Sequence, residues 1–353
     1  MLKFIKILSF LIFIIKINSF TNIRQHNSIQ GLRLMKFNLK NFNNTNIYRF
    51  DKGIKENKLK KKVYNLFSLI RPKNIIPTIF LSFSGGWIIN PSLNLFASIP
   101  FISSIIITIL IMSTSMVLND IYDIEIDKIN NPLRPLASGE LQIKEAILFS
   151  IVLLAICEYL TFKFMPNNLK FIIQLVILKI ILYTPVLKKI LFIKNLSCAS
   201  LISFSLFFSG LSISDTILSN NKNYGLLLIT MSLIFFGSLT NEILLDILDT
   251  DGDKYNNITT ISTTFGKENS LKVSSFIINY SILLNTLVMT YLYNNIIISL
   301  FISLILIPLL LNIKKIKKNN LSNESIIHYM KYSSYPLFGI LIYFCIISYF
   351  SLF

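Results

Sequence analysis

The sequence has 353 residues, 53% of them hydrophobic and 14% charged, and its mean hydropathy of +0.63 excludes an ordinary soluble domain. Its formal charge of +17 would suit a nucleic-acid binder, so the position of the charges has to decide that question. Three cysteines in apolar runs exclude a disulfide scaffold and a zinc knuckle, and two histidines leave little for imidazole catalysis, so chemistry must rest on carboxylates, amines, Asn and Tyr.

The N-terminal 62 residues carry most of the positive charge. They contain 14 basic and two acidic residues, a net charge of +12. Residues 1–20 have the shape of a signal peptide, and residues 21–62 are basic and rich in Asn, like a transit peptide. Together they resemble the two-part address of proteins sent to plastids of secondary origin, in which Phe often follows the cleavage point, and Phe20 stands where that pattern expects it. We therefore predict a plastid membrane protein; the alternative is an uncleaved anchor with a basic tail on an acidic membrane.

Residues 63–353 form the membrane body. A span needs about 20 mainly apolar residues, and nine segments qualify as candidates. The sequence therefore predicts an all-α, polytopic membrane domain, a bundle of nine transmembrane helices. The predicted spans are 74–90, 95–118, 143–164, 169–185, 195–218, 224–245, 270–293, 295–312 and 332–353.

Positive residues between these spans are strongly segregated. The even-numbered loops contain fourteen Lys and Arg, and the odd-numbered loops contain three. Because positive residues concentrate in the loops of one membrane face, this asymmetry supports the span count and places the N-terminus and the even loops on one side. The charge therefore predicts membrane sidedness, and we expect no nucleic-acid partner.

Nine of the 17 acids lie in two clusters, residues 119–127 after span two and residues 242–253 after span six. Both clusters precede even-numbered loops, so both face the positive side. At about 100° per residue, each cluster places its acids on one stripe of a helix, except Glu125 and Asp251, which point elsewhere. The stripes are Asn119, Asp120, Asp123 and Asp127, and Glu242, Asp246, Asp249 and Asp253.

Carboxylates grouped at helix ends in a membrane need cations and a polar cavity. Oxygen ligands without His or Cys favour Mg²⁺ or Ca²⁺, and Mg²⁺ held by a few carboxylates keeps coordination positions for phosphate oxygens. The inferred ligand is a diphosphate bridged to the protein by metal. Two alternatives are solvated loop charges and an exchanger that binds transported cations, but the latter does not explain the neighbouring basic residues.

Basic residues follow both clusters and span four. Arg134 lies between two prolines beside the first cluster, and Lys254 follows the second. Lys128 follows the first cluster directly, and Lys188 and Lys189 follow span four, where membrane topology alone explains them equally well. Such side chains neutralise the charge that grows on a leaving diphosphate.

These motifs together resemble the UbiA superfamily of intramembrane prenyltransferases, over about residues 63–353. Asn119, Asp120, Asp123 and Asp127 match N-D-x-x-D-x-x-x-D, Asp246, Asp249 and Asp253 match D-x-x-D-x-x-x-D, and Arg71-Pro72 matches the usual opening of the first span. The resemblance implies a nine-helix bundle that moves an isoprenoid chain from a polyprenyl diphosphate to a lipophilic or interfacial acceptor, with Mg²⁺ as cofactor.

The resemblance also implies roles for individual residues. The Mg²⁺ ligands would be Asn119, Asp120, Asp123, Asp127, Asp246, Asp249 and Asp253. The diphosphate would contact Arg71, Lys128, Arg134, Lys188, Lys189 and Lys254, and Tyr183 would line the site, although an interfacial belt tyrosine is an equal alternative. The catalytic residues would be Asp123, Asp127, Asp246, Asp253 and Arg134.

The acceptor is open at this stage. Residues 135–140 look like homogentisate prenyltransferases. Residues 119–130 with Arg134-Pro135, and residues 183–189 with Lys194-Asn195, are similar to chlorophyll synthases and geranylgeranylglyceryl phosphate geranylgeranyltransferases. All of these use C20-type donors, so we expect a long-chain donor and an aromatic, tetrapyrrole or glycerol-phosphate acceptor. The competing function is a membrane cation transporter that uses the same carboxylates.

Overall fold

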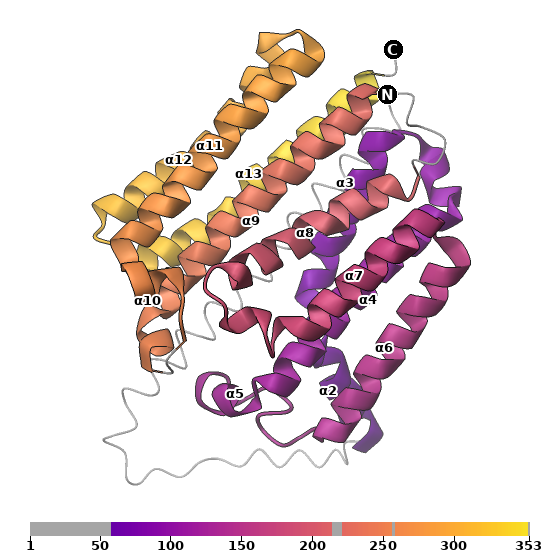
Figure 1. Ribbon diagram of the computed structural model, residues 1–353, viewed down its shortest axis with the longest axis vertical. Helices are drawn as coiled ribbons and strands as arrows, with labels where there is room; N and C mark the ends of the chain where they lie inside the picture. Colours follow the sequence, from indigo (N-terminus) through magenta and orange to yellow (C-terminus); the bar gives the residue numbers. More distant parts are fainter. Residues whose placement is uncertain (1–57, 214–220, 256–257, 352–353) are drawn as a thin grey trace, which may run out of the picture.

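The computed structural model describes residues 58–213, 221–255 and 258–351 (Figure 1). Within these ranges the chain is helical and contains no strand. The predicted signal-like segment and residues 21–57 of the predicted transit-like segment lie outside the described residues. Residues 58–62 are described, and they form the start of a helix that continues into the predicted membrane domain.

Ten helices of twelve or more residues account for most of the described chain. They are α2 (Lys58–Leu69), α3 (Ile75–Ile89), α4 (Ile99–Tyr122), α6 (Ile143–Phe164), α7 (Asn167–Tyr183), α8 (Ile193–Leu211), α9 (Asn221–Tyr255), α11 (Lys267–Tyr293), α12 (Ile296–Lys318) and α13 (Asn323–Phe350). The short helices are α5 (Ile124–Asn130), α10 (Ile261–Phe265), η1 (Pro72–Asn74), η2 (Leu93–Ala97) and η3 (Leu187–Lys189).

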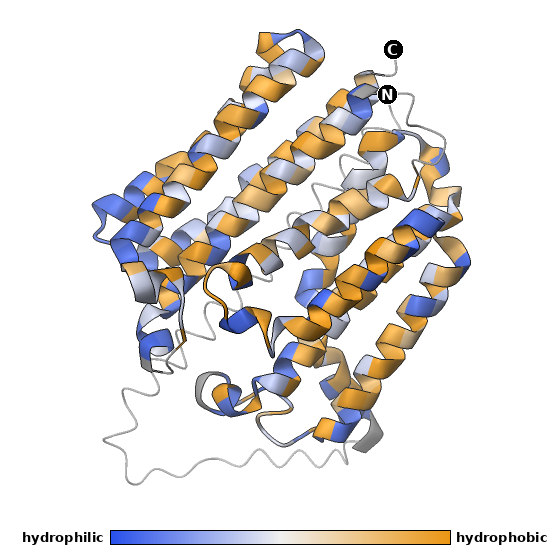
Figure 2. Ribbon diagram, in the orientation of Figure 1, coloured by the Kyte–Doolittle hydropathy of each residue, from blue (hydrophilic) through white to orange (hydrophobic). Residues whose placement is uncertain are grey.

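Six of the described helices are long and apolar enough to cross a membrane: α4, α6, α9, α11, α12 and α13. The protein is therefore an integral, multi-pass membrane protein, as predicted. Helices α3, α7 and α8 overlap the other three predicted spans, but they have only 15, 17 and 19 residues. Figure 2 shows hydrophobic residues along the lengths of the helices, as expected for surfaces that face lipid or the interior of a bundle.

The helices pack side by side with neighbours that are often distant in sequence. Helix α9 contacts α8 and α11, α3 contacts α8, and α4 contacts α6. At the α3 and α8 crossing, a Cβ atom on Gly85 would lie 1.9 Å from the carbonyl oxygen of Leu206, so only glycine permits this backbone approach. Because α8 contacts α3, α4, α7 and α9, its position determines what surrounds its first residues.

Polar side chains inside the bundle find partners on adjacent helices, as a low-dielectric interior requires. Gln174 of α7 donates to the Glu158 carboxylate of α6 at 2.7 Å. Lys179 of α7 donates to the Ser200 hydroxyl of α8. Both charged residues therefore have partners within the bundle.

One end of the bundle collects the functional segments. The C-terminal end of α4, the helix α5, the first residues of α8 and the helix α10 lie at the same end in Figure 1. Both predicted acidic clusters precede loops at this end. The long helix α9 runs on to Tyr255, ten residues past the predicted end of span six at residue 245, so it carries the whole second cluster.

Candidate active site

The first acidic motif crosses a helix break. Helix α4 ends at Tyr122, and Asp123 lies between α4 and α5, so the single continuous helix expected for this stripe is interrupted. The backbone still follows the i to i−4 pattern: the amide of Asp123 donates to Asn119 at 3.0 Å and that of Asp127 to Asp123 at 2.7 Å. The motif residues therefore stay one turn apart, and the predicted stripe survives the break.

Two arginines converge on this motif. Arg71 Nη2 donates to Asp120 Oδ1 at 2.8 Å, and Arg134 Nη1 donates to the same oxygen at 3.0 Å and to Asp127 Oδ2 at 2.5 Å. The carboxylates of Asp120 and Asp127 are 5% and 6% exposed. A carboxylate this deeply buried is costly unless it is paired, and Arg134 pairs with two of them at once.

Arg71 reaches the motif from a strained backbone. Its φ of 50° places it in the left-handed region, directly before Pro72 of η1. For a residue other than glycine, this conformation costs about 1–3 kcal/mol and persists only where surrounding contacts hold it. The bond to Asp120 is such a contact.

The end of span four supplies one lysine to the site and not two. Lys188 Nζ contacts Asp123 Oδ2 at 2.5 Å, and Thr184 donates to the amide oxygen of Asn119 at 3.5 Å. The side chain of Lys189 is exposed, and its carbonyl accepts a bond from Thr259. The two lysines are equivalent by sequence, and the turn of η3 separates them.

The second motif is centred on Asp246 of α9, which is 1% exposed. Its Oδ1 accepts from Lys194 at 2.7 Å and its Oδ2 from Asn195 Nδ2 at 2.8 Å. The Ser262 hydroxyl of α10 donates to the Asp246 carbonyl at 2.6 Å. Asp246 therefore ties the start of α8 and the helix α10 to α9.

Lys194 and Asn195 were not among the predicted site residues. The available signal was a Lys-Asn pair at the start of the predicted span 195–218, on the same positive face as both acidic clusters. That signal alone also fits a topological lysine. The contact with Asp246 requires α8 and α9 to pack together, which the sequence pattern does not state.

The remaining residues of the second motif differ in exposure. Asp249 is exposed and Asp253 is half-buried. Within the described ranges, Asp253 Oδ2 is one of four buried side-chain polar atoms that have no hydrogen-bond partner. A buried carboxylate oxygen without a donor carries a desolvation cost of about 1–3 kcal/mol or more, and a bound cation would remove that cost.

Some predicted residues lie away from these contacts. Lys128 pairs with Glu125 at 2.7 Å, with their side chains 51% and 82% exposed, and Asp251 pairs with Lys267 at 3.2 Å. Glu125 and Asp251 thus lie off the two acidic stripes, as predicted, and their side chains are exposed. Lys254 is exposed.

Tyr183 lies in the wall of the bundle between α7 and α8. Its hydroxyl is 3.0 Å from the Cys198 sulfur of α8. The same Cys198 side chain is hydrogen-bonded to Glu242 of the second cluster, and the charges of Glu242 and Asp123 act on the Tyr183 hydroxyl. That Tyr183 lines the diphosphate site stays a prediction.

The site thus combines four acids with four basic side chains at one end of the bundle. Asp120, Asp123, Asp127 and Asp246 contact Arg71, Arg134, Lys188 and Lys194. Within the described ranges, no group of three or more His, Cys, Asp or Glu side chains is arranged to hold a metal ion. The donors are nevertheless hard oxygens, and Asp253 Oδ2 is buried without a hydrogen-bond donor, so the chemistry of this set fits Mg²⁺.

Comparisons with known proteins agree on one family. The profile of the UbiA prenyltransferase family matches residues 75–335. A digeranylgeranylglyceryl phosphate synthase from Saccharolobus solfataricus is 35% identical over 171 residues, which cover 48% of this chain and 58% of that protein. The synthase from Methanococcus aeolicus is 35% identical over 231 residues, which cover 65% of this chain and 77% of that protein.

Solved structures give the same fold. The structure of a digeranylgeranylglyceryl phosphate synthase is 25% identical, with a TM-score of 0.65, and covers 81% of this chain and 98% of that chain. A UbiA homologue from Archaeoglobus fulgidus, described as bound to DMAPP and Mg²⁺, is 20% identical, with a TM-score of 0.57 and coverage of 81% and 98%.

Proposed function

Because the chain belongs to the UbiA prenyltransferase family, we propose that it transfers a C20-type isoprenoid chain from its diphosphate to a glycerol-phosphate acceptor at the membrane. The observation that carries the proposal is the double acidic motif whose carboxylates contact Arg71, Arg134, Lys188 and Lys194 at one end of the bundle. The names of the relatives from Saccharolobus and Methanococcus favour the glycerol-phosphate acceptor over homogentisate and chlorophyllide.

We assign Mg²⁺ to the two acidic motifs. The homologue described with DMAPP and Mg²⁺ supports this assignment, as does the oxygen-only donor set. When bound, Mg²⁺ supplies positive charge against the diphosphate oxygens. The residues assigned to it are Asn119, Asp120, Asp123 and Asp127 in the first motif and Asp246, Asp249 and Asp253 in the second.

The basic side chains have a separate task in this proposal. Arg134, Lys188 and Lys194 neutralise carboxylates in the structure. We assign to them the neutralisation of the charge that grows on the diphosphate when the donor is bound. Breaking the bond between C1 and oxygen sends its electron pair to the diphosphate and leaves an allylic cation. The apolar helices around the site exclude water from that cation. The acceptor hydroxyl then attacks C1 and gives its proton to the released diphosphate, so the products are the prenyl ether and protonated diphosphate.

An acceptor screen tests this function. Nanodiscs or membranes with the protein, labelled geranylgeranyl diphosphate and Mg²⁺ are expected to form product with geranylgeranylglyceryl phosphate, as read by product mass. EDTA should abolish the reaction, and added Mg²⁺ should restore it. Product with homogentisate or chlorophyllide alone would contradict the acceptor. Metal flux across proteoliposomes without any prenyl transfer would favour the cation transporter instead.

We further propose that α3, α7 and α8 cross the membrane together with the six longer helices, giving nine spans. The support is their overlap with predicted spans and the segregation of fourteen against three basic residues between the loops. With nine spans, the acidic motifs lie on the lysine-rich face.

The plastid address is a proposal that rests on the sequence, because the relatives named above are archaeal. Its physical basis is the signal-like run in residues 1–20 and the basic, acid-poor run that follows it up to residue 57, since residues 58–62 of the predicted transit-like segment belong to α2. A fusion of residues 1–57, the part of the predicted address that precedes α2, to a fluorescent protein is expected to enter the plastid of a cell with a secondary plastid. Reporter retained in the endoplasmic reticulum or sent to mitochondria would contradict it.

A further inference from the structure

Helix α2 has apolar residues on two opposite faces. Its inner face places Leu66 and Leu69 in a cluster with Val117 of α4, and Asn65 is buried on the same side. At about 100° per residue, the outer face carries one stripe at i, i+3, i+4 and i+7. That stripe lines a shallow groove and consists of Lys60, Val63, Tyr64 and Phe67.

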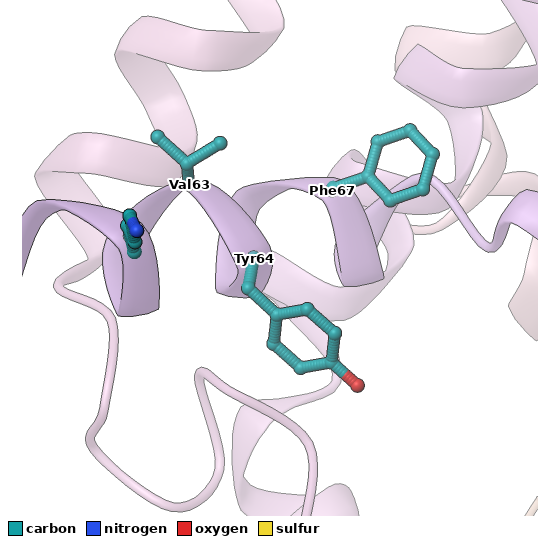
Figure 3. A pocket seen from close by; sticks show the side chains of 4 residues that line it. Val63, Tyr64 and Phe67 are labelled. Atoms are coloured by element: carbon teal, nitrogen blue, oxygen red, sulfur yellow. The ribbon is translucent and has the colours of Figure 1, made fainter. Parts of the chain in front are cut away.

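The outer stripe has no protein partner large enough to cover it among the described residues. Val63, Tyr64 and Phe67 are 58%, 71% and 52% exposed, and Figure 3 shows their side chains projecting from α2 in different directions. Apolar side chains with this exposure in a membrane protein are covered by lipid when they lie at the depth of the bilayer.

Charge identifies the kind of lipid surface. Lys60 lines the groove, on a helix that lies at the same end of the bundle as α5 in Figure 1, whereas Lys61 and Lys62 are on the inner side and pair with Glu140 and Glu145. A basic helix with an apolar stripe lies in the interfacial plane of a bilayer, with tyrosine at the depth of the headgroups. Lys60, which lies on this stripe, is attracted to acidic headgroups by about 1 kcal/mol.

The same helix is fastened to the loop that carries Arg134. Lys61 Nζ is 3.2 Å from Glu140 Oε1, Asn65 Nδ2 donates to Glu140 Oε2 at 3.2 Å, and Lys62 pairs with Glu145 of α6. The loop itself is closed by a bond from the Leu141 amide to the Pro135 carbonyl at 3.0 Å. A shift of α2 would therefore move the loop on which Arg134 sits.

Arg71 depends on α2 more directly. It follows the last residue of the helix, Leu69, by two positions, and its amide bonds back to the Ser68 carbonyl at 3.2 Å. Both arginines that contact Asp120 are thus connected to α2, one through the chain and one through Glu140.

We propose that the outer face of α2 docks into a bilayer interface rich in acidic headgroups, and that this docking positions Arg71 and Arg134 for the diphosphate. The second half rests on the proposed function, whereas the docking does not. Lys60, Val63, Tyr64 and Phe67 make the lipid contact, and Lys61, Lys62 and Asn65 transmit the position of the helix to Glu140 and Glu145.

Depth-dependent quenching tests the docking without any activity measurement. The full-length Phe67→Trp protein is placed in nanodiscs of phosphatidylcholine with phosphatidylglycerol, made with or without brominated acyl chains. The natural Trp87 is 3% exposed, so the unsubstituted protein gives the background. We expect about a twofold loss of the added emission with bromine near the headgroups, and a smaller loss with bromine deeper in the chains.

Three results would overturn the docking. Red-shifted emission without quenching would place the introduced indole in water. Blue-shifted emission without quenching would mean that protein covers the face, either another segment of the chain or a second copy. Equal quenching in nanodiscs of phosphatidylcholine alone would show that the docking does not depend on acidic headgroups.

A kinetic measurement tests the positioning. The Tyr64→Gln and Phe67→Gln double variant is expected to raise KM for the prenyl diphosphate about tenfold, because an interaction that positions a binding group is weakened. Tyr64→Phe with Phe67→Leu should restore it. The matched control is Tyr291→Gln. Tyr291 is an aromatic residue near the C-terminal end of α11, and it is 86% exposed. An unchanged KM in the double variant would overturn the positioning, whereas absence of transfer by the unsubstituted protein would count against the proposed function alone.

Discussion

Replacing Asp246 by Asn is expected to lower prenyl-transfer turnover by about 10²–10³-fold, the loss seen when one preorganised electrostatic contact is removed from an active site. Asp246 is 1% exposed, and both of its carboxylate oxygens accept bonds, from Lys194 and from Asn195. The amide keeps the shape of the side chain and removes its charge. Lys194 then loses its counter-ion, and the second motif loses its most deeply buried carboxylate.

Initial rates with labelled donor at saturating Mg²⁺ measure this effect. Asp251→Asn is the matched control, because Asp251 lies on the same helix with a side chain that is 83% exposed and pairs with Lys267 outside the site. It should stay within about twofold of the unsubstituted rate, as exposed pairs contribute little. Turnover of Asp246→Asn equal to that of the control would remove Asp246 from the chemistry.

Stability has to be separated from chemistry in this variant, because Asp246 also ties α8 and α10 to α9. The Ser262 bond goes to the backbone carbonyl of Asp246 and is unaffected by the substitution. Breaking a buried ion pair on one side costs about 3–5 kcal/mol, so the thermal midpoint should fall as well. Binding of an unreactive donor analogue is therefore measured below the thermal midpoint of Asp246→Asn. If the variant still binds the analogue there, it is folded, and its loss of turnover is a loss of chemistry.

The sequence predicts the parts of the site that depend on helical periodicity. Asn119, Asp123 and Asp127 recur every four residues, and that spacing puts them on one side even though the helix breaks at Asp123. The same reasoning sends Glu125 and Asp251 outward. Periodicity is local, so a single sequence contains it.

Helical periodicity does not predict which side chains meet between different helices. Lys188 reaches Asp123 from 65 residues away, and Lys194 reaches Asp246 from 52 residues away. Nothing local distinguishes Lys188 from Lys189, and only the turn of η3 places one at the site. Pairing of this kind depends on how α7, α8 and α9 pack, which hydropathy does not encode.

The sequence likewise predicts some parts of the fold and not others. Hydropathy locates every long helix from α3 onward to within a few residues at most ends, but it ends span six at residue 245, whereas α9 continues to Tyr255. Asp and Gly in this extension are poor helix formers, and the contacts of Asp246 with α8 and α10 hold it in place. Helix α2 was missed because its lysines look like a basic tail. Its inner contacts with Glu140 and Val117 lie far away in sequence.

Replacing Arg134 by Lys is expected to lower kcat/KM for the prenyl diphosphate by about 10–100-fold, although the positive charge is kept. Arg134 Nη1 contacts Asp120 and Asp127 together, and the planar guanidinium has further donors that suit phosphate oxygens. An ammonium group is a single point charge on a flexible stem, so it can hold one carboxylate or the phosphate, and not all three in a fixed geometry. Steady-state kinetics over donor concentration measure the loss.

Arg71→Lys is the informative comparison, because Arg71 contacts Asp120 alone. Its loss should be smaller than that of Arg134→Lys. The double variant should lose less than the sum of the two single losses, since the two side chains share one acceptor oxygen, Asp120 Oδ1, and neighbours that share a partner are not additive. Additive losses would mean that the two arginines act on separate parts of the donor, and full activity in Arg134→Lys would show that charge, and not the bridging geometry, is what the diphosphate requires at this position.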